Sequence, residues 1–287
     1  MQVPGKMVKV NDTYMHVYRV PKRLAYTKGT IVFLAGFGTE CPTYDFKPLW
    51  HLLEGKFSMA VVERPGYGWS GETRCPRDID TVVEETREAL RQADISGPFI
   101  PAGHSISGLD ALYWAQKYPG EISAIIGLDM VVPKAYESLE VPHFLTAGVK
   151  LAHLLRRPVA KAMVKSHPAV KNNILDKKQQ EEMFKITLNQ LLSKNMIDEI
   201  GFVKQNADKV GAGECPSLPV LCFLSNDKRS LKRIPSWGKI HRDYFAVNSQ
   251  VEFIDLPCGH YVHREEPELI AKRIMEFLFP GNSTISI

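Results

Sequence analysis

Residues 98–109 read PFIPAGHSISGL, and this stretch decides the fold. It opens with a short apolar run of strand length and continues into a helical pattern that reaches about residue 118. Between the two lies a turn that places Ser105 among small residues, with Gly103 two positions before it and Ser107 two positions after it. Small residues there let the chain reverse sharply and let a helix begin close to the strand. The stretch therefore predicts a strand, a tight turn carrying a serine, and a helix.

Length and composition limit the class of protein. The chain has 287 residues, of which 44% are hydrophobic and 24% charged, as in ordinary globular proteins. A net charge of +4 is too small to predict nucleic-acid binding. No apolar run is long enough to span a membrane, and the first residues show no secretory signal. Five scattered cysteines favour a reducing compartment, so we expect a cytoplasmic protein.

Apolar runs alternate with helical patterns on both sides of the turn. A hairpin is expected at 7–20, with its turn at Asn11-Asp12. The expected strands lie at 30–35, 58–62, 99–102, 123–128, 219–224 and 251–256. Two of the helices expected in this part are 46–53 and 78–94. A third begins after Ser105, and a fourth begins near Pro267 and ends at Pro280-Gly281. Unbroken apolar strands that alternate with helices predict a mostly parallel sheet of about eight strands, with helices on both faces.

The pattern changes between 133 and 212, where no strand is predicted. The helical stretches expected there are 144–155, 159–165, 178–192 and 196–203. We therefore expect a core domain made of 1–132 and 213–287, with a helical cap inserted at 133–212. Ligands of such sheets bind at the carboxyl ends of the strands, where Ser105 and Asp129 both fall.

These features together resemble the α/β-hydrolase fold superfamily. Residues 103–107 are similar to its nucleophile elbow, Gly-x-Ser-x-Gly, with Ser107 in place of the last glycine. The Gly-Phe-Gly loop at 36–38, the stretch RPGYGWS at 64–70 and the late Gly-His at 259–260 also match the family's order of motifs. The resemblance covers nearly the whole chain, is weakest in the cap, and implies a serine hydrolase.

The resemblance implies that Ser105 is the nucleophile and that His260, after the last strand, is its base. Choosing Ser107 as the nucleophile instead would put Leu109 where a small residue is needed. His263 is the rival base, but we expect it to point away as a surface or supporting histidine. The histidines of the cap, His143, His153 and His167, are expected at the surface.

The acid that orients the histidine has two candidates. Asp227 follows the strand after which the commonest family members keep their acid, but it is one residue out of register, with Ser225 where those members have glycine. Asp129 directly ends the apolar run 123–128, as in the subgroup with haloalkane dehalogenases. We favour Asp129 and retain Asp227 as the alternative.

The oxyanion hole implied by the resemblance uses the backbone amides of Phe37 and Ile106. No metal or other cofactor is expected, because no Cys/His spacing matches a zinc site. The expected function is cleavage of a carboxylic ester of a small or medium acyl group through an acyl-serine intermediate. The alternatives are an aminopeptidase or amidase resembling proline iminopeptidase, whose cap acids would be Glu181 and Glu182, and a non-catalytic ligand-binding member of the fold. The expected partner is a small-molecule substrate, and the sequence predicts no oligomeric state.

Overall fold

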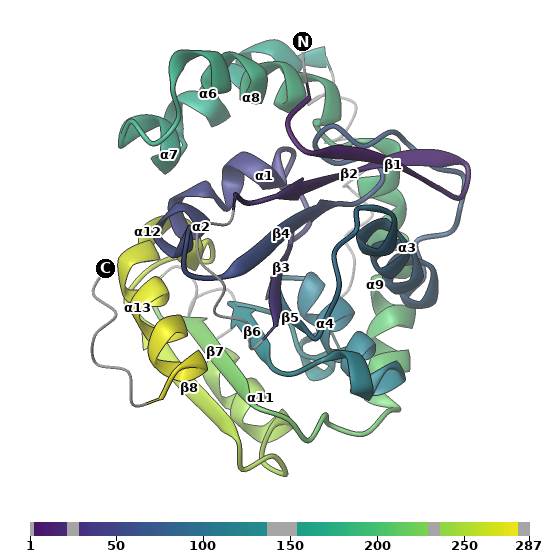
Figure 1. Cartoon of the computed structure of the whole chain (residues 1–287), viewed down its shortest axis with the longest axis vertical. Helices are drawn as coiled ribbons and strands as arrows, with labels where there is room; N and C mark the ends of the chain where they lie inside the picture. The colour runs from purple at the N-terminus through teal and green to yellow at the C-terminus, as the bar shows by residue number, and fades with distance from the viewer. Residues whose placement is uncertain (1–2, 22–28, 137–153, 229–235, 281–287) are drawn as a thin grey trace.

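An eight-stranded sheet forms the centre of the protein (Figure 1). The structure is a computed structural model of the chain and describes residues 3–21, 29–136, 154–228 and 236–280. The strands are β1 (Lys6–Val10), β2 (Thr13–Arg19), β3 (Thr30–Leu34), β4 (Ser58–Glu63), β5 (Phe99–His104), β6 (Ile125–Leu128), β7 (Val220–Ser225) and β8 (Val251–Leu256).

The strands lie in the order β1-β2-β4-β3-β5-β6-β7-β8. The first two pairs, β1 with β2 and β2 with β4, are antiparallel, and every later pair is parallel. β3, β5, β6 and β7 are buried along their whole length, which explains their mostly apolar sequences. Because β3 to β8 run in one direction, their carboxyl ends meet at one edge of the sheet.

Helices cover both faces of the sheet (Figure 1). One core holds buried side chains of α3 (Ile79–Gln92), α4 (Ser107–Lys117) and α11 (Trp237–Tyr244). The core on the other face holds those of α2 (Lys47–Leu53) and α13 (Pro267–Leu278), which pack against each other. The predicted fold class, a mostly parallel sheet of about eight strands with helices on both faces, is confirmed.

We call residues 133–212, which connect β6 to β7, the insertion. Its described elements are all helical: η2 (Pro133–Tyr136), α6 (Arg156–Ser166), α7 (Pro168–Lys171), α8 (Lys177–Gln190) and α9 (Lys194–Gly211). Side chains of α6, α7 and α8 share an apolar cluster with Cys41 and Tyr44, at α1 (Pro42–Asp45). α9 instead runs back along the core and packs near α4 (Figure 1).

The predicted hairpin, strands and long helices of the described ranges are confirmed, with ends shifted by a few residues. α9 is much longer than the expected 196–203, because its core-facing positions continue to Ala207 and Val210. α11 and the one-turn helices α1, α7 and α12 (Val262–Glu265) were not predicted, since helices this short carry little apolar periodicity. The expected helix 144–155 lies mostly outside the described residues. Within the described ranges, no helix combines the length and apolarity needed to cross a bilayer.

Candidate active site

Ser105 lies on the turn between β5 and α4. Its φ angle is 55°, in the left-handed region that residues with a side chain seldom adopt. The turn is tight, since a Cβ added at Gly103 would lie 2.7 Å from the Ser107 carbonyl oxygen. A Cβ at Gly36 would lie 2.7 Å from the Cβ of Ser105. Glycine is therefore needed at both positions, and the loop after β3 can pass directly beside the serine.

His260 lies in the loop after β8 and contacts the serine. The ring nitrogen Nε2 is 2.9 Å from Ser105 Oγ, and Nδ1 is 2.6 Å from Asp129 Oδ2. The His260 side chain remains 33% exposed, whereas that of Asp129 is 1% exposed. Both nitrogens of the ring are thus engaged, one by a hydroxyl and the other by a buried carboxylate.

Asp129 directly follows β6, and its backbone is also left-handed, with a φ of 51°. Its carboxylate accepts the Ser225 amide at 2.7 Å and the Ser225 hydroxyl at 2.8 Å. The indole Nε1 of Trp237 donates to the same carboxylate at 2.7 Å. These donors compensate for the loss of water around a buried charge and fix the carboxylate in front of His260.

Of the two candidate acids, the structure shows Asp129 bonded to the ring of His260. Asp227 is half-buried two residues beyond the end of β7, while the Nδ1 of His260 bonds to Asp129. The sequence singled out Ser225 as the residue in the family's glycine position, but did not reveal that it holds the carboxylate from the neighbouring strand. Trp237 was missed, because it lies on α11, a helix that the sequence did not predict.

Phe37 and Ile106 lie on the two segments that flank Ser105. Phe37 is half-buried in the loop after β3, and Ile106 is buried at the start of α4. Among the described residues, neither backbone amide has a hydrogen-bond acceptor. Backbone amides without an acceptor on both sides of a serine are groups that can bind an oxyanion.

Three basic side chains surround the carboxylate of Asp45. They are His263 and Arg264, which follow His260 in the chain, and His167 of the insertion. The buried carboxylate of Asp45 bonds to His263 Nε2 at 2.7 Å, to His167 Nε2 at 3.0 Å and to Arg264. Burial opposes its charge, but Arg264 and the two imidazoles hold the pKa of Asp45 well below its ordinary value. Burial lowers the pKa of His263, which favours its neutral form.

His167 is buried in this cluster, so the expectation that it lies at the surface was wrong. The reason is its position just before α7, where the insertion packs onto the core and Asp45 offers a partner. His263 is fully buried and bonded to Asp45 rather than to Ser105, as a supporting histidine would be. His143 and His153 lie outside the described residues.

Glu40 was also missed by sequence reasoning. It is 7% exposed and lines a cavity of about 130 Å³ between the loop after β3 and the insertion, together with His167 and Arg264. Burial raises the pKa of Glu40 to about 7, against the opposing effects of its own amide and of Arg264. No motif marked it, because its burial depends on the insertion.

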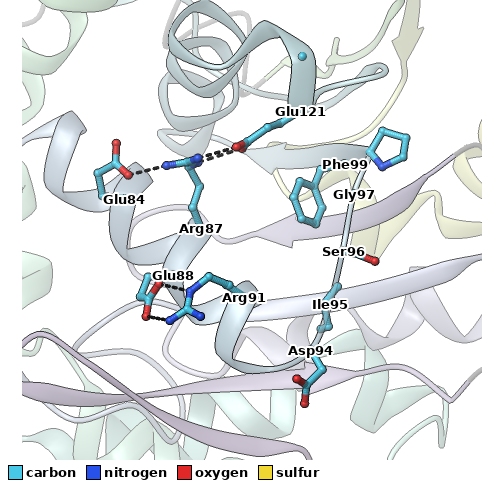
Figure 2. Close-up of a pocket in the computed structure, with 12 residues that line it drawn as sticks. Glu84, Arg87, Glu88, Arg91, Asp94, Ile95, Ser96, Gly97, Phe99 and Glu121 are labelled. Atoms are coloured by element: carbon cyan, nitrogen blue, oxygen red, sulfur yellow. Dashed lines mark hydrogen bonds and ion pairs between the residues drawn. The ribbon is translucent and has the colours of Figure 1, made fainter.

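Figure 2 shows the residues that line a larger groove, of about 880 Å³, at the other end of β5 from Ser105. It is lined by the end of α3 and by residues 94–99, which lead into the start of β5, whereas Ser105 follows the end of that strand. Its guanidinium groups are paired, Arg87 with Glu84 and Glu121, and Arg91 with Glu88. Within the described ranges, no three His, Cys, Asp or Glu side chains are arranged to hold a metal ion.

Known proteins are similar to this chain in sequence and in fold. Residues 31–273 match the alpha/beta hydrolase family. The uncharacterized protein YbdG of Bacillus subtilis (strain 168) is 32% identical over 282 residues, which cover 96% of this chain and 85% of that protein. The crystal structure of Cfl2 from Burkholderia cenocepacia has a TM-score of 0.71 at 19% identity, covering 96% of this chain and 95% of Cfl2.

A putative lipase from Acinetobacter baumannii AYE is also similar in structure. Its TM-score is 0.69 at 18% identity, and the match covers 95% of this chain and 90% of the lipase. At such identities the two structures show a shared fold alone. The family match spans all the motifs at the sheet edge, from the loop at Phe37 to the loop at His260. The chain therefore belongs to the alpha/beta hydrolase family.

Proposed function

We propose that the protein hydrolyses carboxylic esters of small or medium acyl groups through an acyl-serine intermediate. Ser105 is the nucleophile, His260 the general base, and Asp129 the acid that orients the imidazole. The observation that supports this proposal is the continuous series of contacts from Ser105 Oγ to His260 Nε2, at 2.9 Å, and from His260 Nδ1 to Asp129, at 2.6 Å.

In the first step, Ser105 Oγ attacks the ester carbonyl carbon while its proton passes to His260 Nε2. Asp129 accepts a hydrogen bond from Nδ1 and stabilises the imidazolium that forms. The negative charge that develops on the carbonyl oxygen is bound by the amides of Phe37 and Ile106. When the tetrahedral intermediate collapses, the bond to the alcohol breaks and His260 returns the proton to the departing oxygen.

In the second step, water attacks the acyl carbon and gives a proton to His260. The same two amides bind the second oxyanion, and its collapse releases the carboxylic acid. The proton then returns from His260 to Ser105 Oγ, so that the resting site is restored.

We propose that the insertion is a cap that selects the substrate. This proposal is supported by the place of the insertion between β6, which Asp129 directly follows, and β7, which Ser225 ends. It is also supported by the contacts of the insertion with the loop after β3. The similarity to a putative lipase is consistent with an ester substrate.

An aminopeptidase function receives less support. That chemistry would use acids of the insertion to hold a substrate ammonium group. Glu182, one of the two cap acids that this alternative would use, is 5% exposed and accepts a hydrogen bond from the Tyr44 hydroxyl. The Glu182 carboxylate therefore connects the insertion to α1. Of the two glutamates, only Glu181 is exposed.

A fluorophosphonate probe tests the proposed mechanism directly. Such a probe should label the protein at Ser105, and Ser105→Ala should abolish the labelling while leaving the circular dichroism spectrum unchanged. A panel of p-nitrophenyl esters and amino-acid anilides then separates esterase from aminopeptidase activity. Undiminished labelling of Ser105→Ala, or turnover of anilides alone, would contradict the proposal.

A further inference from the structure

The carbonyl oxygen of Ala35 is held by two buried side chains. Ala35 ends the apolar run of β3 and directly precedes the loop of Gly36 and Phe37. Its oxygen accepts a hydrogen bond from Arg64 Nη2 at 2.7 Å and another from Ser107 Oγ. Ala35, Arg64 and Ser107 are 3%, 4% and 0% exposed, so water does not compete for these bonds.

The bond from Ser107 connects the two segments that flank the nucleophile. Ser107 follows Ile106 directly at the start of α4, while Ala35 lies two residues before Phe37. One hydroxyl therefore links the segment that carries one proposed oxyanion donor to the segment that carries the other. A glycine, which the family pattern places at this position, has no hydroxyl to make the link.

The guanidinium of Arg64 is itself held in place from two elements. Asp110 Oδ2, on α4, lies 3.1 Å from Nη1, and Glu199 Oε2, on α9, lies 3.5 Å from Nη2. The Tyr67 hydroxyl donates to the same Glu199 oxygen at 2.6 Å, and the Tyr67 ring lies 4.9 Å from the guanidinium carbon. Arg64 thus connects the helix of the nucleophile, the insertion and the loop of Phe37.

We propose that Ser107 and Arg64 are positioning residues of the oxyanion hole, which act by holding the Ala35 carbonyl. This inference rests on the proposed function. The loop needs such an anchor because Gly36 and Gly38 flank Phe37, and glycine leaves the orientation of the intervening peptides free. An amide stabilises developing charge best when it points at the oxyanion before the reaction begins.

The rate of fluorophosphonate labelling measures this effect without a known substrate, because negative charge develops on the phosphoryl oxygen as Ser105 attacks. Ser107→Ala and Ser107→Gly both keep a small residue at the turn. Each should lower the maximal labelling rate about tenfold, less than the loss of an oxyanion donor itself. The probe's half-saturating concentration should change less than twofold, because the bound but unreacted probe carries no oxyanion.

Ser70→Ala is the matched control. The Ser70 hydroxyl is also buried and donates to a backbone carbonyl, that of Glu63, at 2.6 Å. It also accepts the His16 amide at 2.8 Å, so this variant should lose at least as much thermal stability as Ser107→Ala. Its maximal labelling rate should nevertheless equal that of the unaltered protein.

Arg64→Lys provides a second measurement. A lysine keeps the charge near Asp110 and Glu199 but lacks the planar fork that also reaches Ala35. Its maximal labelling rate should fall, and the fall should be larger in the double variant with Ser107→Ala. Ser107 variants that label at the normal rate, or a Ser70→Ala variant that slows equally, would overturn the positioning role alone. Absence of labelling in the unaltered protein would overturn the proposed function, and the positioning role with it.

Discussion

Ser225 donates both its backbone amide and its hydroxyl to the carboxylate of Asp129, at 2.7 and 2.8 Å. Asp129 directly follows β6 and Ser225 ends the neighbouring parallel strand β7, so the pairing of these strands brings the two residues together. Ser225, two residues before the candidate acid Asp227, thus donates hydrogen bonds to the other candidate acid, Asp129.

Asp129→Asn should leave the protein folded but lower kcat by up to about 10⁴-fold, because the imidazole loses its orienting carboxylate. Asp227→Asn is the comparison, and it should cost far less, since asparagine is well tolerated in turns. Ester turnover and fluorophosphonate labelling of both variants measure the difference. A larger loss of turnover in Asp227→Asn than in Asp129→Asn would show that Asp227, which follows β7, is the acid.

His260→Ala and His263→Ala should have opposite profiles. The first removes the proposed base, which is 33% exposed, and should reduce kcat at least about 10³-fold with little change in melting temperature. The second removes a fully buried ring and leaves Asp45 without one partner, so it should cost about 2–4 kcal/mol of unfolding free energy. Its remaining folded fraction should still be labelled at Ser105. Equal loss of labelling in both variants would give His263 a part in the reaction.

Trp237→Phe should weaken the site by removing one donor from Asp129. We expect kcat to fall by about tenfold or less, because Ser225 still holds the carboxylate. Trp50→Phe is a close control: its indole is equally buried and donates to the Thr43 carbonyl at 2.9 Å, away from His260. Both variants lose an indole hydrogen bond, so a change in kcat restricted to Trp237→Phe would come from Asp129. Matching kcat values for the two would exclude a role for Trp237.

Glu40 should make stability depend on pH. Since burial raises the pKa of Glu40 to about 7 from an ordinary 4.5, the folded state keeps its proton over a range in which the unfolded chain has lost it. The favourable effect of protonation is complete below about 4.5 and is lost as pH rises through about 7. Glu40→Gln should therefore stabilise the protein at pH 8, by up to about 3 kcal/mol, and much less at pH 5.

Urea unfolding of Glu40→Gln at the two pH values measures this effect. Glu181→Gln, at an exposed position of α8, is the control and should change stability by about 0.5 kcal/mol or less at either pH. A Glu40→Gln variant whose stabilisation is the same at pH 5 and pH 8 would show that the carboxyl group ionises in the ordinary range.

The sequence predicted the sheet well, because β3, β5 and β7 are short, mostly apolar runs of strand length that alternate with helical patterns. The resemblance to the α/β-hydrolases implied Ser105 and His260 and favoured Asp129 over Asp227, and the structure places Ser105, His260 and Asp129 in contact. Those predictions used local sequence motifs and the order of the predicted strands, both of which can be read directly from the sequence.

The partners of these residues could not be predicted in the same way. Ser225 and Trp237 reach Asp129 across gaps of 96 and 108 residues. Asp45 meets His167 only because the insertion folds back onto α1. Such contacts depend on how helices pack on the sheet, and no periodicity or short motif records that packing. Ser107 is a mixed case. Its departure from the family's glycine was visible in the sequence, but the hydrogen bond from its hydroxyl to the Ala35 carbonyl was not.

The four residues at the centre of the site follow four adjacent strands, Ser105 after β5, Asp129 after β6, Ser225 at the end of β7 and His260 after β8. These strands have the same order in the sequence as in space. During synthesis Ser105 and Asp129 therefore leave the ribosome long before His260 does. A nascent chain that stops short of β8 lacks His260, so under the proposed mechanism its Ser105 has no base until β8 and the loop after it have been made.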